Sequence, residues 1–148
     1  MKNIVFSKPC PCRLRDSTPL AYAQCCQIWH GALAQGEHAP SPEQLMRSRY
    51  SAYALATQNN PQGHAMLDYL LATWHTSTVP SDLELSPTAW LGLQVIHAQA
   101  STDAGVVEFV AYYKEGGKAQ QMHEISRFVR GEQGQWLYID GQSPQASA

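Results

Sequence analysis

The sequence predicts an α+β fold in which a curved antiparallel sheet packs on helices that come before it in the chain. The first indication is a set of apolar side chains at helical spacing between residues 41 and 74. The second is a series of β-rich runs, separated by glycine-containing turns, that fills residues 90–141. With 148 residues, of which 44% are hydrophobic, the chain can bury one core of ordinary size. A cysteine-rich segment before the helices predicts a small additional module.

The first 30 residues contain every cysteine of the chain, in two close pairs: Cys10, Cys12, Cys25 and Cys26. Zinc binds four thiolates in a tetrahedron, and a short segment outside the main core can fold around the ion because metal–sulfur bonds take the place of a core. Reduced free cysteines and disulfides are the alternatives. Disulfides are uncommon in cytosolic proteins, and adjacent cysteines bridge each other only with strain. We therefore expect the four cysteines to bind zinc.

His30 is a further candidate ligand in this segment. It follows Cys26 by four residues, so on a helical turn both side chains lie on one face and His30 can replace a cysteine. The alternative, which we favour, is a histidine beside Trp29 that does not bind the ion.

Two helices are predicted after a connection rich in Gly, Ala and Pro at residues 31–41. Ser41 can cap the first helix, and Pro42 suits its first turn. The polar run at residues 57–63 ends this helix. A second helix is expected over residues 64–74, where apolar side chains are spaced to face a core.

Four strands are predicted next, and their expected ranges are 90–101, 105–116, 118–131 and 134–141. Short connections that contain glycine make them an antiparallel meander. Side chains alternate between the two faces of a strand, so one face of each central strand is expected to point toward the helices. This inward set is Val107, Phe109, Ala111, Tyr113, Met122, Glu124, Ser126 and Phe128. A sheet that curves around helices leaves a cavity where a small molecule can bind.

Polar side chains near this cavity are the candidate pocket residues, namely Arg47, Arg49, Tyr50, Tyr53, His75 and Glu124. Glu124 would be a carboxylate in apolar surroundings, where a nearby cation is needed to keep it ionised, and Arg47 or Arg49 is the expected partner. A catalytic alternative makes Glu124 a general base, His75 a proton shuttle and a tyrosine the oxyanion donor. We favour the structural alternative, an ion pair and tyrosine hydroxyls that stabilise the core.

The cysteine segment resembles the SEC-C zinc motif, a small metal module attached to many bacterial proteins. The resemblance rests on Cys10-Pro11-Cys12, Tyr22-Ala23-Gln24-Cys25-Cys26 and Trp29-His30, although the connection between the pairs is longer than usual and lacks glycine. Further blocks resemble the bacterial YchJ family: LMRSRYSAY (45–53), DYLLATWH (68–75), WLGLQV (90–95), VEFVAYY (107–113), HEISRFVR (123–130) and QWLYIDG (135–141). The resemblance implies a SEC-C motif followed by a nuclear-transport-factor-two-like cone, also called cystatin-like, in a family without an established activity.

The expected domains are a SEC-C-like zinc module at residues 1–30, the α+β domain at residues 31–141 and a loose tail at residues 142–148. We expect a binding or adaptor protein in which the zinc module recognises a protein partner and the larger domain is a scaffold or binds a small molecule. The alternative is a small-molecule enzyme, isomerase-like or hydrolase-like, that uses the pocket. The sequence shows no nucleophile arrangement, phosphate loop or open three-ligand metal site, which argues against the enzyme.

Composition argues against two further classes of function. The formal net charge of −2 is not that of a general nucleic-acid-binding protein, which usually carries a basic stripe. No apolar run approaches the roughly 20 residues that a membrane-spanning helix needs. The first residues are interrupted by Lys8 and Pro9 too early for a secretory signal. We therefore expect a cytoplasmic protein without membrane insertion.

Overall fold

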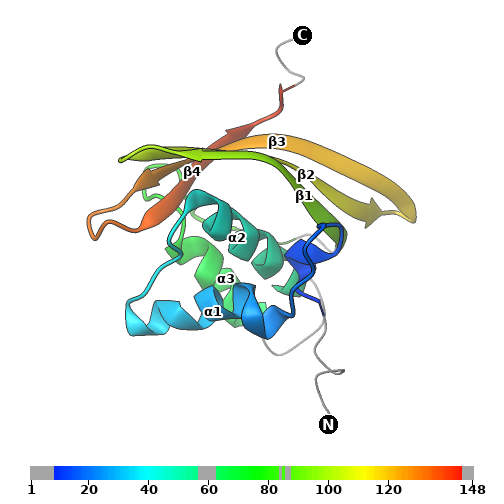
Figure 1. Cartoon of the computed structure of the whole chain (residues 1–148), viewed down its shortest axis with the longest axis horizontal. Coiled ribbons are helices and arrows are strands. Elements are labelled where there is room, and N and C mark those ends of the chain that lie inside the picture. The colour runs from blue at the N-terminus through cyan, green and yellow to red at the C-terminus, as the bar shows by residue number, and fades with distance from the viewer. Residues whose placement is uncertain (1–8, 57–62, 84, 86–87, 145–148) are drawn as a thin grey trace.

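The computed structural model describes residues 9–56, 63–83, 85 and 88–144. Its first part is helical, with η2 (Pro11–Arg13), η3 (Tyr22–Gln24), α1 (Cys26–Ala32), η4 (Leu33–Gln35), α2 (Pro42–Ala56) and α3 (Gly63–Ala72). Its second part is a sheet of β1 (Ala89–Ala100), β2 (Ala104–Glu115), β3 (Lys118–Arg130) and β4 (Trp136–Gln142). Helices followed by an antiparallel sheet confirm the predicted α+β class (Figure 1). No described helix is both long and apolar enough to span a membrane.

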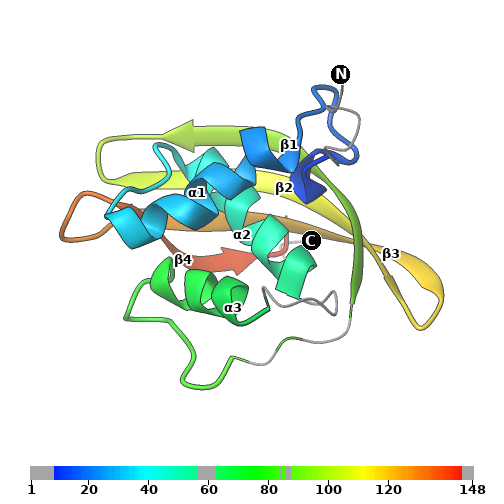
Figure 2. The same ribbon diagram turned by 90° about the horizontal axis from the view of Figure 1, so that it is seen from below.

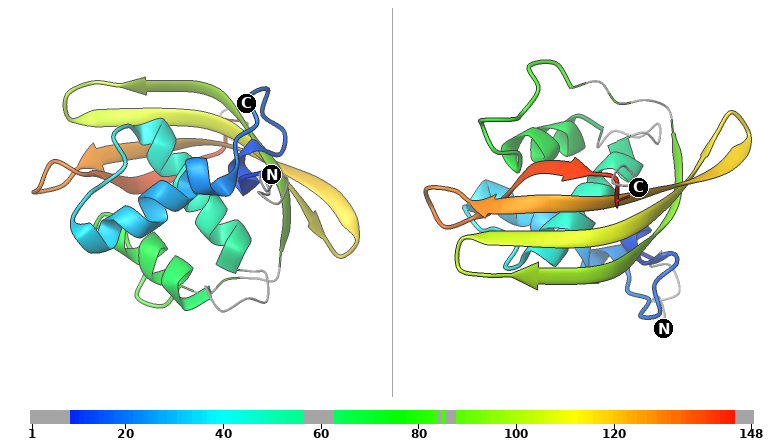
Figure 3. Two further views of the ribbon diagram at one scale, coloured as in Figure 1. Left: turned by 60° about the horizontal axis from the view of Figure 1, so that its bottom comes forward. Right: turned by 90° about the horizontal axis from the view of Figure 1, so that it is seen from above.

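The sheet is an antiparallel meander in which neighbours in space are also neighbours in the chain. The β2–β3 turn uses Gly116 and Gly117, whose φ angles of 59° and 79° lie in the left-handed region that favours glycine. Register shifts interrupt the β1–β2 and β3–β4 pairings, and such bulges bend a strand. The sheet consequently curves over the helices, which lie on one of its faces (Figures 1 and 2). No helix of the described chain covers its outer face (Figure 3, right).

Helix α2 is the central element, because it contacts α1, α3 and the sheet. Its start is capped by Ser41, whose hydroxyl oxygen accepts a hydrogen bond from the Gln44 backbone N–H at 3.2 Å. Pro42 follows at the first helical position and packs on Gly105 of β2, where a Cβ atom would overlap the proline ring. A glycine in β2 thus lets the start of α2 approach the sheet closely.

The predicted strand faces are confirmed. Val107 and Phe109 of β2 and Phe128 of β3 are buried on the inner face. Glu108 and His123 lie on the outer face, where a Glu108 carboxylate oxygen is 2.8 Å from His123 Nε2. Period-two alternation therefore places the inward set correctly on the two central strands.

Helix α3 ends at Ala72, before the predicted end at residue 74. Trp74 instead forms an isolated parallel bridge with Tyr138 of β4, and the His75 backbone N–H donates to the Tyr138 carbonyl at 2.8 Å. Backbone pairing with β4 thus replaces the last helical turn. The predicted break at residues 57–63 lies outside the described residues except for Gly63. Of the predicted tail at residues 142–148, Gln142 is the last residue of β4, and residues 145–148 lie outside the described residues.

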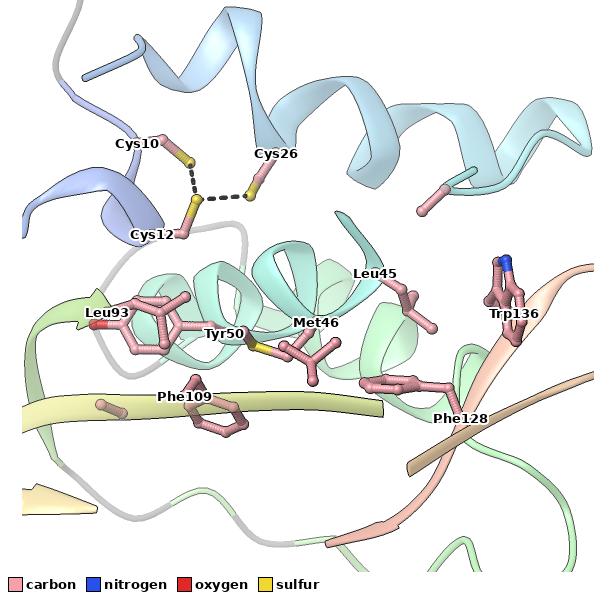
Figure 4. Packing of buried hydrophobic residues seen from close by; sticks show 13 residues of the cluster. Cys10, Cys12, Cys26, Leu45, Met46, Tyr50, Leu93, Phe109, Phe128 and Trp136 are labelled. Atoms are coloured by element: carbon pink, nitrogen blue, oxygen red, sulfur yellow. Dashed lines mark hydrogen bonds between the residues drawn. The ribbon is translucent and has the colours of Figure 1, made fainter. Parts of the chain in front are cut away.

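The main buried cluster joins side chains of the helices, the sheet and the cysteine segment (Figure 4). Cys10, Cys12 and Cys26 are at most 1% exposed and belong to the same cluster as Leu45 and Phe128. The expectation that the thiols lie outside the main core is therefore wrong. The reason is that the cysteine segment packs directly on α2 and does not fold around the ion alone.

Candidate metal centre and ligand cavity

The four cysteine sulfurs form a compact cluster beside α2. Cys12 Sγ lies 3.8 Å from Cys10 Sγ and 3.6 Å from the Sγ atoms of both Cys25 and Cys26. Cys25 Sγ and Cys26 Sγ are 4.0 Å apart, and all four atoms lie within 4.8 Å of one another. Figure 4 shows Cys10, Cys12 and Cys26 pointing toward one another. All four cysteines are free of disulfides.

These distances suit an ion bound by four thiolates. Metal–sulfur bonds of about 2.3 Å in a tetrahedron separate each pair of sulfurs by roughly 3.8 Å. The observed separations begin at 3.6 Å and do not exceed 4.8 Å, so small side-chain rotations suffice to complete the tetrahedron. The cluster can hold a metal ion.

Backbone pairing brings the first two cysteines into place. Cys10 directly precedes η2, and Cys12 lies within it. The Cys10 backbone N–H donates to the Leu20 carbonyl at 2.7 Å, and Pro9 and Ala21 form an antiparallel bridge. This pairing closes the long, glycine-free connection that departs from the usual SEC-C pattern.

The second two cysteines begin helix α1, with Cys25 as its N-cap residue and Cys26 as its first residue. Helix α2 faces them with Ser51, whose Oγ donates to Cys26 Sγ at 3.2 Å and lies 3.4 Å from Cys10 Sγ. The cluster is thus held between three pieces of chain: η2, the start of α1 and the middle of α2.

Two arginines stand beside the sulfurs. Arg13 Nε donates to Cys25 Sγ at 3.5 Å, while Arg47 Nη1 donates to the Cys12 carbonyl at 3.1 Å and reaches Cys12 Sγ at 3.8 Å. Arg47 also forms an ion pair with Asp16 at 2.7 Å. Four thiolates around a divalent ion carry net negative charge, which adjacent guanidinium groups stabilise. Sequence reasoning missed the contact of Arg47 because Arg47 and Cys12 are far apart in the chain.

Hydrogen bonds within the cluster separate the pKa values of its thiols. The pKa of Cys25 is strongly lowered by hydrogen bonds from the neighbouring thiols, Cys10 first, and from Arg13. The pKa of Cys10 is lowered to about 6, chiefly by the hydrogen bond from Cys12. The pKa of Cys26 is raised by its hydrogen bonds to the other thiols and by burial. Metal binding would release the protons that remain.

His30 makes two hydrogen bonds to other groups of the protein. Its Nε2 lies 2.8 Å from the Ser48 carbonyl, which requires Nε2 to donate, and its Nδ1 lies 2.6 Å from the Tyr22 hydroxyl. Burial lowers the pKa of His30 and favours this neutral form. The ligand atoms that gather in the metal cluster come from the four cysteines, without His30.

A cavity of about 280 Å³ lies between α2 and the inner face of the sheet. Its apolar wall consists of Met46, Trp90, Phe109, Ala111, Met122 and Phe128. Its polar members are Arg49, Tyr50, Tyr53, Glu124, Ser126 and Tyr138. An apolar concavity with a small set of polar groups is the usual form of a small-molecule site.

The structure places most of the predicted pocket residues on this wall: Arg49, Tyr50, Tyr53 and Glu124. Arg47 does not belong to it, because residues two apart on a helix point about 200° from each other, so Arg47 faces the cysteine segment. His75 does not belong to it either. It follows α3, and its Nδ1 lies 2.7 Å from the Ser77 hydroxyl. The catalytic set of Glu124, His75 and a tyrosine is therefore not assembled.

Arg49 is 5% exposed and held in one orientation. Its Nη1 donates to the Leu70 carbonyl at 2.8 Å and to Thr73 Oγ1 at 2.7 Å. Its guanidinium carbon lies 4.8 Å from the ring centre of Trp74 and 4.7 Å from that of Tyr138. Burial lowers the pKa of Arg49.

The predicted ion pair of Glu124 is not formed, which corrects the expectation for both arginines. Among the described residues, neither Arg47 nor Arg49 has an N···O contact with Glu124 within 4.0 Å. Ser126 Oγ donates to Glu124 Oε2 at 2.6 Å instead, and the carboxylate packs against Gly141 of β4. Arg49 and Glu124 thus line one cavity as separate charges.

Sequence reasoning missed Trp90 and Tyr138 as wall residues. Alternation along β4 from the buried Trp136 points to Tyr138, so that signal was present. Trp90 precedes the bulge at Gly92, and a simple two-residue period cannot show its direction.

Fold and geometry define a class: an α+β protein whose cysteine segment can hold a metal ion and whose sheet and helices enclose a cavity of small-molecule size. The chain belongs to the YchJ family. Its residues 41–141 match the family described as YchJ, middle NTF2-like domain. A UPF0225 protein of Bordetella pertussis is 47% identical over 144 residues, which cover 95% of this chain and 96% of that relative. A UPF0225 protein of Chromobacterium violaceum is 46% identical over 139 residues, covering 89% and 90%.

Two solved structures share the fold, and both are described as containing a SEC-C motif. A SEC-C motif containing protein from Psychrobacter arcticus superimposes with a TM-score of 0.69 at 32% identity, covering 93% of this chain and 84% of that one. A SEC-C motif containing protein from Rhodopseudomonas palustris gives 0.68 at 30% identity, covering 86% and 94%. The predicted combination of a SEC-C motif with a nuclear-transport-factor-two-like domain is thereby confirmed.

Proposed function

We propose that the protein is a zinc-containing binding protein whose α+β domain takes up a small molecule. The observation that carries this proposal is the cavity, in which a few polar side chains converge within an apolar wall. The zinc site stabilises the cysteine segment, which packs on the side of α2 that faces away from the cavity. Because zinc needs the thiols reduced, a cytoplasmic location suits the protein.

The donor set supports zinc as the metal of this site. Four sulfur ligands favour zinc among the common divalent ions, and a closed set of four protein ligands is typical of a structural site. We expect about one zinc per chain by elemental analysis of freshly reduced protein. Cys12→Ser should lose the metal, whereas Ser51→Ala, which touches the sulfurs without being a ligand, should retain it. Zinc-free wild-type protein would contradict the assignment.

Uptake of a small molecule is tested with the neutral fluorescent probe N-phenyl-1-naphthylamine. We expect saturable binding to one site and a marked loss of binding in Ala111→Met, because Ala111 lies on the cavity wall. The matched control is Val110→Met, whose side chain belongs to the opposite face of the same strand. Equal binding by the two variants would place the probe elsewhere and contradict a role for the cavity.

A protein partner for the cysteine segment is the second candidate function. Leu14 and Ile28 favour it, because they flank the cysteines and are 49% and 48% exposed. Both lie outside the apolar cavity, so a partner and a small molecule can bind together. The small-molecule enzyme finds less support, since His75 lies away from Glu124.

A further inference from the structure

We infer that the cavity selects a small organic acid, with an apolar or aromatic body, a carboxylate that meets Arg49 and a hydrogen-bond donor that meets Glu124. The inference rests on the proposed function and names the class of ligand. It follows from two opposite charges that line one apolar cavity without pairing with each other.

Arg49 is the cationic group of the cavity. A buried cation is costly unless its charge is compensated. Two hydrogen bonds and two aromatic rings compensate Arg49 in part, and no described carboxylate comes within 4.0 Å of its guanidinium. Its bond to the Leu70 carbonyl helps to cap the C-terminal end of α3. That role uses Nη1, and a further hydrogen bond links the guanidinium to the Tyr53 hydroxyl. A guanidinium has five donors in a planar fork, so donors remain for a carboxylate. The aromatic rings of Trp74 and Tyr138 hold the fork on the cavity wall.

Glu124 is the anionic group of the cavity. Its carboxylate is fixed by Ser126 on the sheet side of the cavity, while Arg49 comes from α2 on the helix side. A ligand carboxylate is repelled by Glu124 and attracted by Arg49, so the acid end is oriented toward the helix. The opposite end then faces a carboxylate that accepts hydrogen bonds, which favours a hydroxyl or an amino group there.

The body of the ligand is defined by the wall between the two charges. Phe109, Phe128, Met46 and Met122 offer apolar surface. Tyr50 is buried, and its hydroxyl makes no hydrogen bond of normal geometry to a described residue. The ring of Tyr50 packs edge-on against the ring of Trp90. Ring-shaped ligands match these surfaces, because aromatic side chains stack on or abut planar groups.

The test compares three probes by calorimetry on the purified protein with its metal in place. The probes are 4-hydroxyphenylacetate, its uncharged amide 4-hydroxyphenylacetamide, and phenylacetate, which lacks the donor. At pH 7.5 we expect the hydroxy acid to bind at least about tenfold more tightly than the amide, because a hydrogen-bonded charge pair is lost. Phenylacetate should bind more weakly than the hydroxy acid. This comparison uses the unmodified chain, so it does not depend on whether a variant folds.

Variants of Arg49 and Glu124 test whether each charge causes the expected difference in affinity between the probes. Arg49→Lys keeps a cation but loses the fork, and it should reduce the preference for the acid over the amide. Glu124→Gln removes the like charge and retains an acceptor for Ser126, so it should strengthen binding of phenylacetate. A purely structural Arg49 would lower the melting temperature on substitution and leave the ratio of acid to amide affinity unchanged.

The outcomes separate this inference from the function on which it rests. Equal affinity for the acid and the amide overturns the ligand class, and so does absence of acid binding by a protein that binds N-phenyl-1-naphthylamine. Failure of all these probes to bind overturns the cavity function as well. A preference for the acid that persists in Arg49→Lys and in Arg49→Met overturns the role of Arg49.

Discussion

His30 shows how one buried side chain ties the cysteine segment to α2. Its Nε2–H donates to the Ser48 carbonyl, its Nδ1 accepts from Tyr22, and its ring meets Tyr69 edge-on at 4.7 Å between centres. Protonation of Nδ1 would place a charge in a buried position and reverse the hydrogen bond, so that the Tyr22 hydroxyl would have to accept it. The neutral ring is therefore the form that the fold requires.

This requirement predicts a pH dependence of stability. Burial lowers the pKa of His30 below its ordinary value of 6.5. A folded-state pKa below the unfolded one means that the unfolded chain binds more protons, so the stabilisation is present above about pH 6.5 and is lost as the pH falls through the folded value. Urea unfolding at pH 7.5 and pH 5.5 should show a larger loss of stability for the wild type than for His30→Gln.

The glutamine variant is the control for all other titrating groups. Its side-chain amide can donate to the Ser48 carbonyl as Nε2 does, and the carboxylates and thiols are unchanged. Equal losses in the two proteins over this pH range would show that His30 is not the group responsible.

The elements show which parts of the fold the sequence predicts well. The inner faces of β2 and β3 could be assigned correctly because the period of two depends only on local geometry. Glu124 was placed on the cavity wall for the same reason. Whether an arginine pairs with Glu124 could not be assigned this way, since that depends on how α2 is rotated about its axis. That rotation sends Arg47 to the cysteines and Arg49 to the cavity.

The end of the sheet offers a prediction about stability. Trp136 of β4 is 3% exposed, and the Arg130 guanidinium lies 4.1 Å from the centre of its ring. Trp136→Ala should lower the free energy of unfolding by about 3–5 kcal/mol, because a large buried aromatic leaves a cavity. The control is Ile96→Ala on β1, which is 51% exposed and should change stability by only about 0.5 kcal/mol. Denaturant unfolding followed by circular dichroism measures both, and similar values would contradict the assigned burial.

At the scale of the whole molecule, the cysteine cluster and the α+β domain share one core. We therefore predict that removal of the metal by a chelator lowers the melting temperature of the entire chain in a single transition, because the ion binds only the folded form. Far-ultraviolet circular dichroism measures the transition with and without chelator. In Cys12→Ser the chelator should have no further effect. Two separate transitions, or an unchanged melting temperature in wild-type protein, would show that the segment unfolds independently.

The position of the four cysteines has a consequence for the order in which the chain is assembled during translation. All four lie between residues 10 and 26, whereas β4 ends at Gln142. The segment that can bind the ion and the helix on which it packs thus leave the ribosome before any strand does. The opposite side of α2 stays in water until β2 and β3 are made, and Arg49 stays hydrated until Tyr138 of β4 arrives over it. The metal-binding part of the molecule can therefore form early in translation. The last strand to be synthesised, β4, is the one that removes water from the buried guanidinium of Arg49.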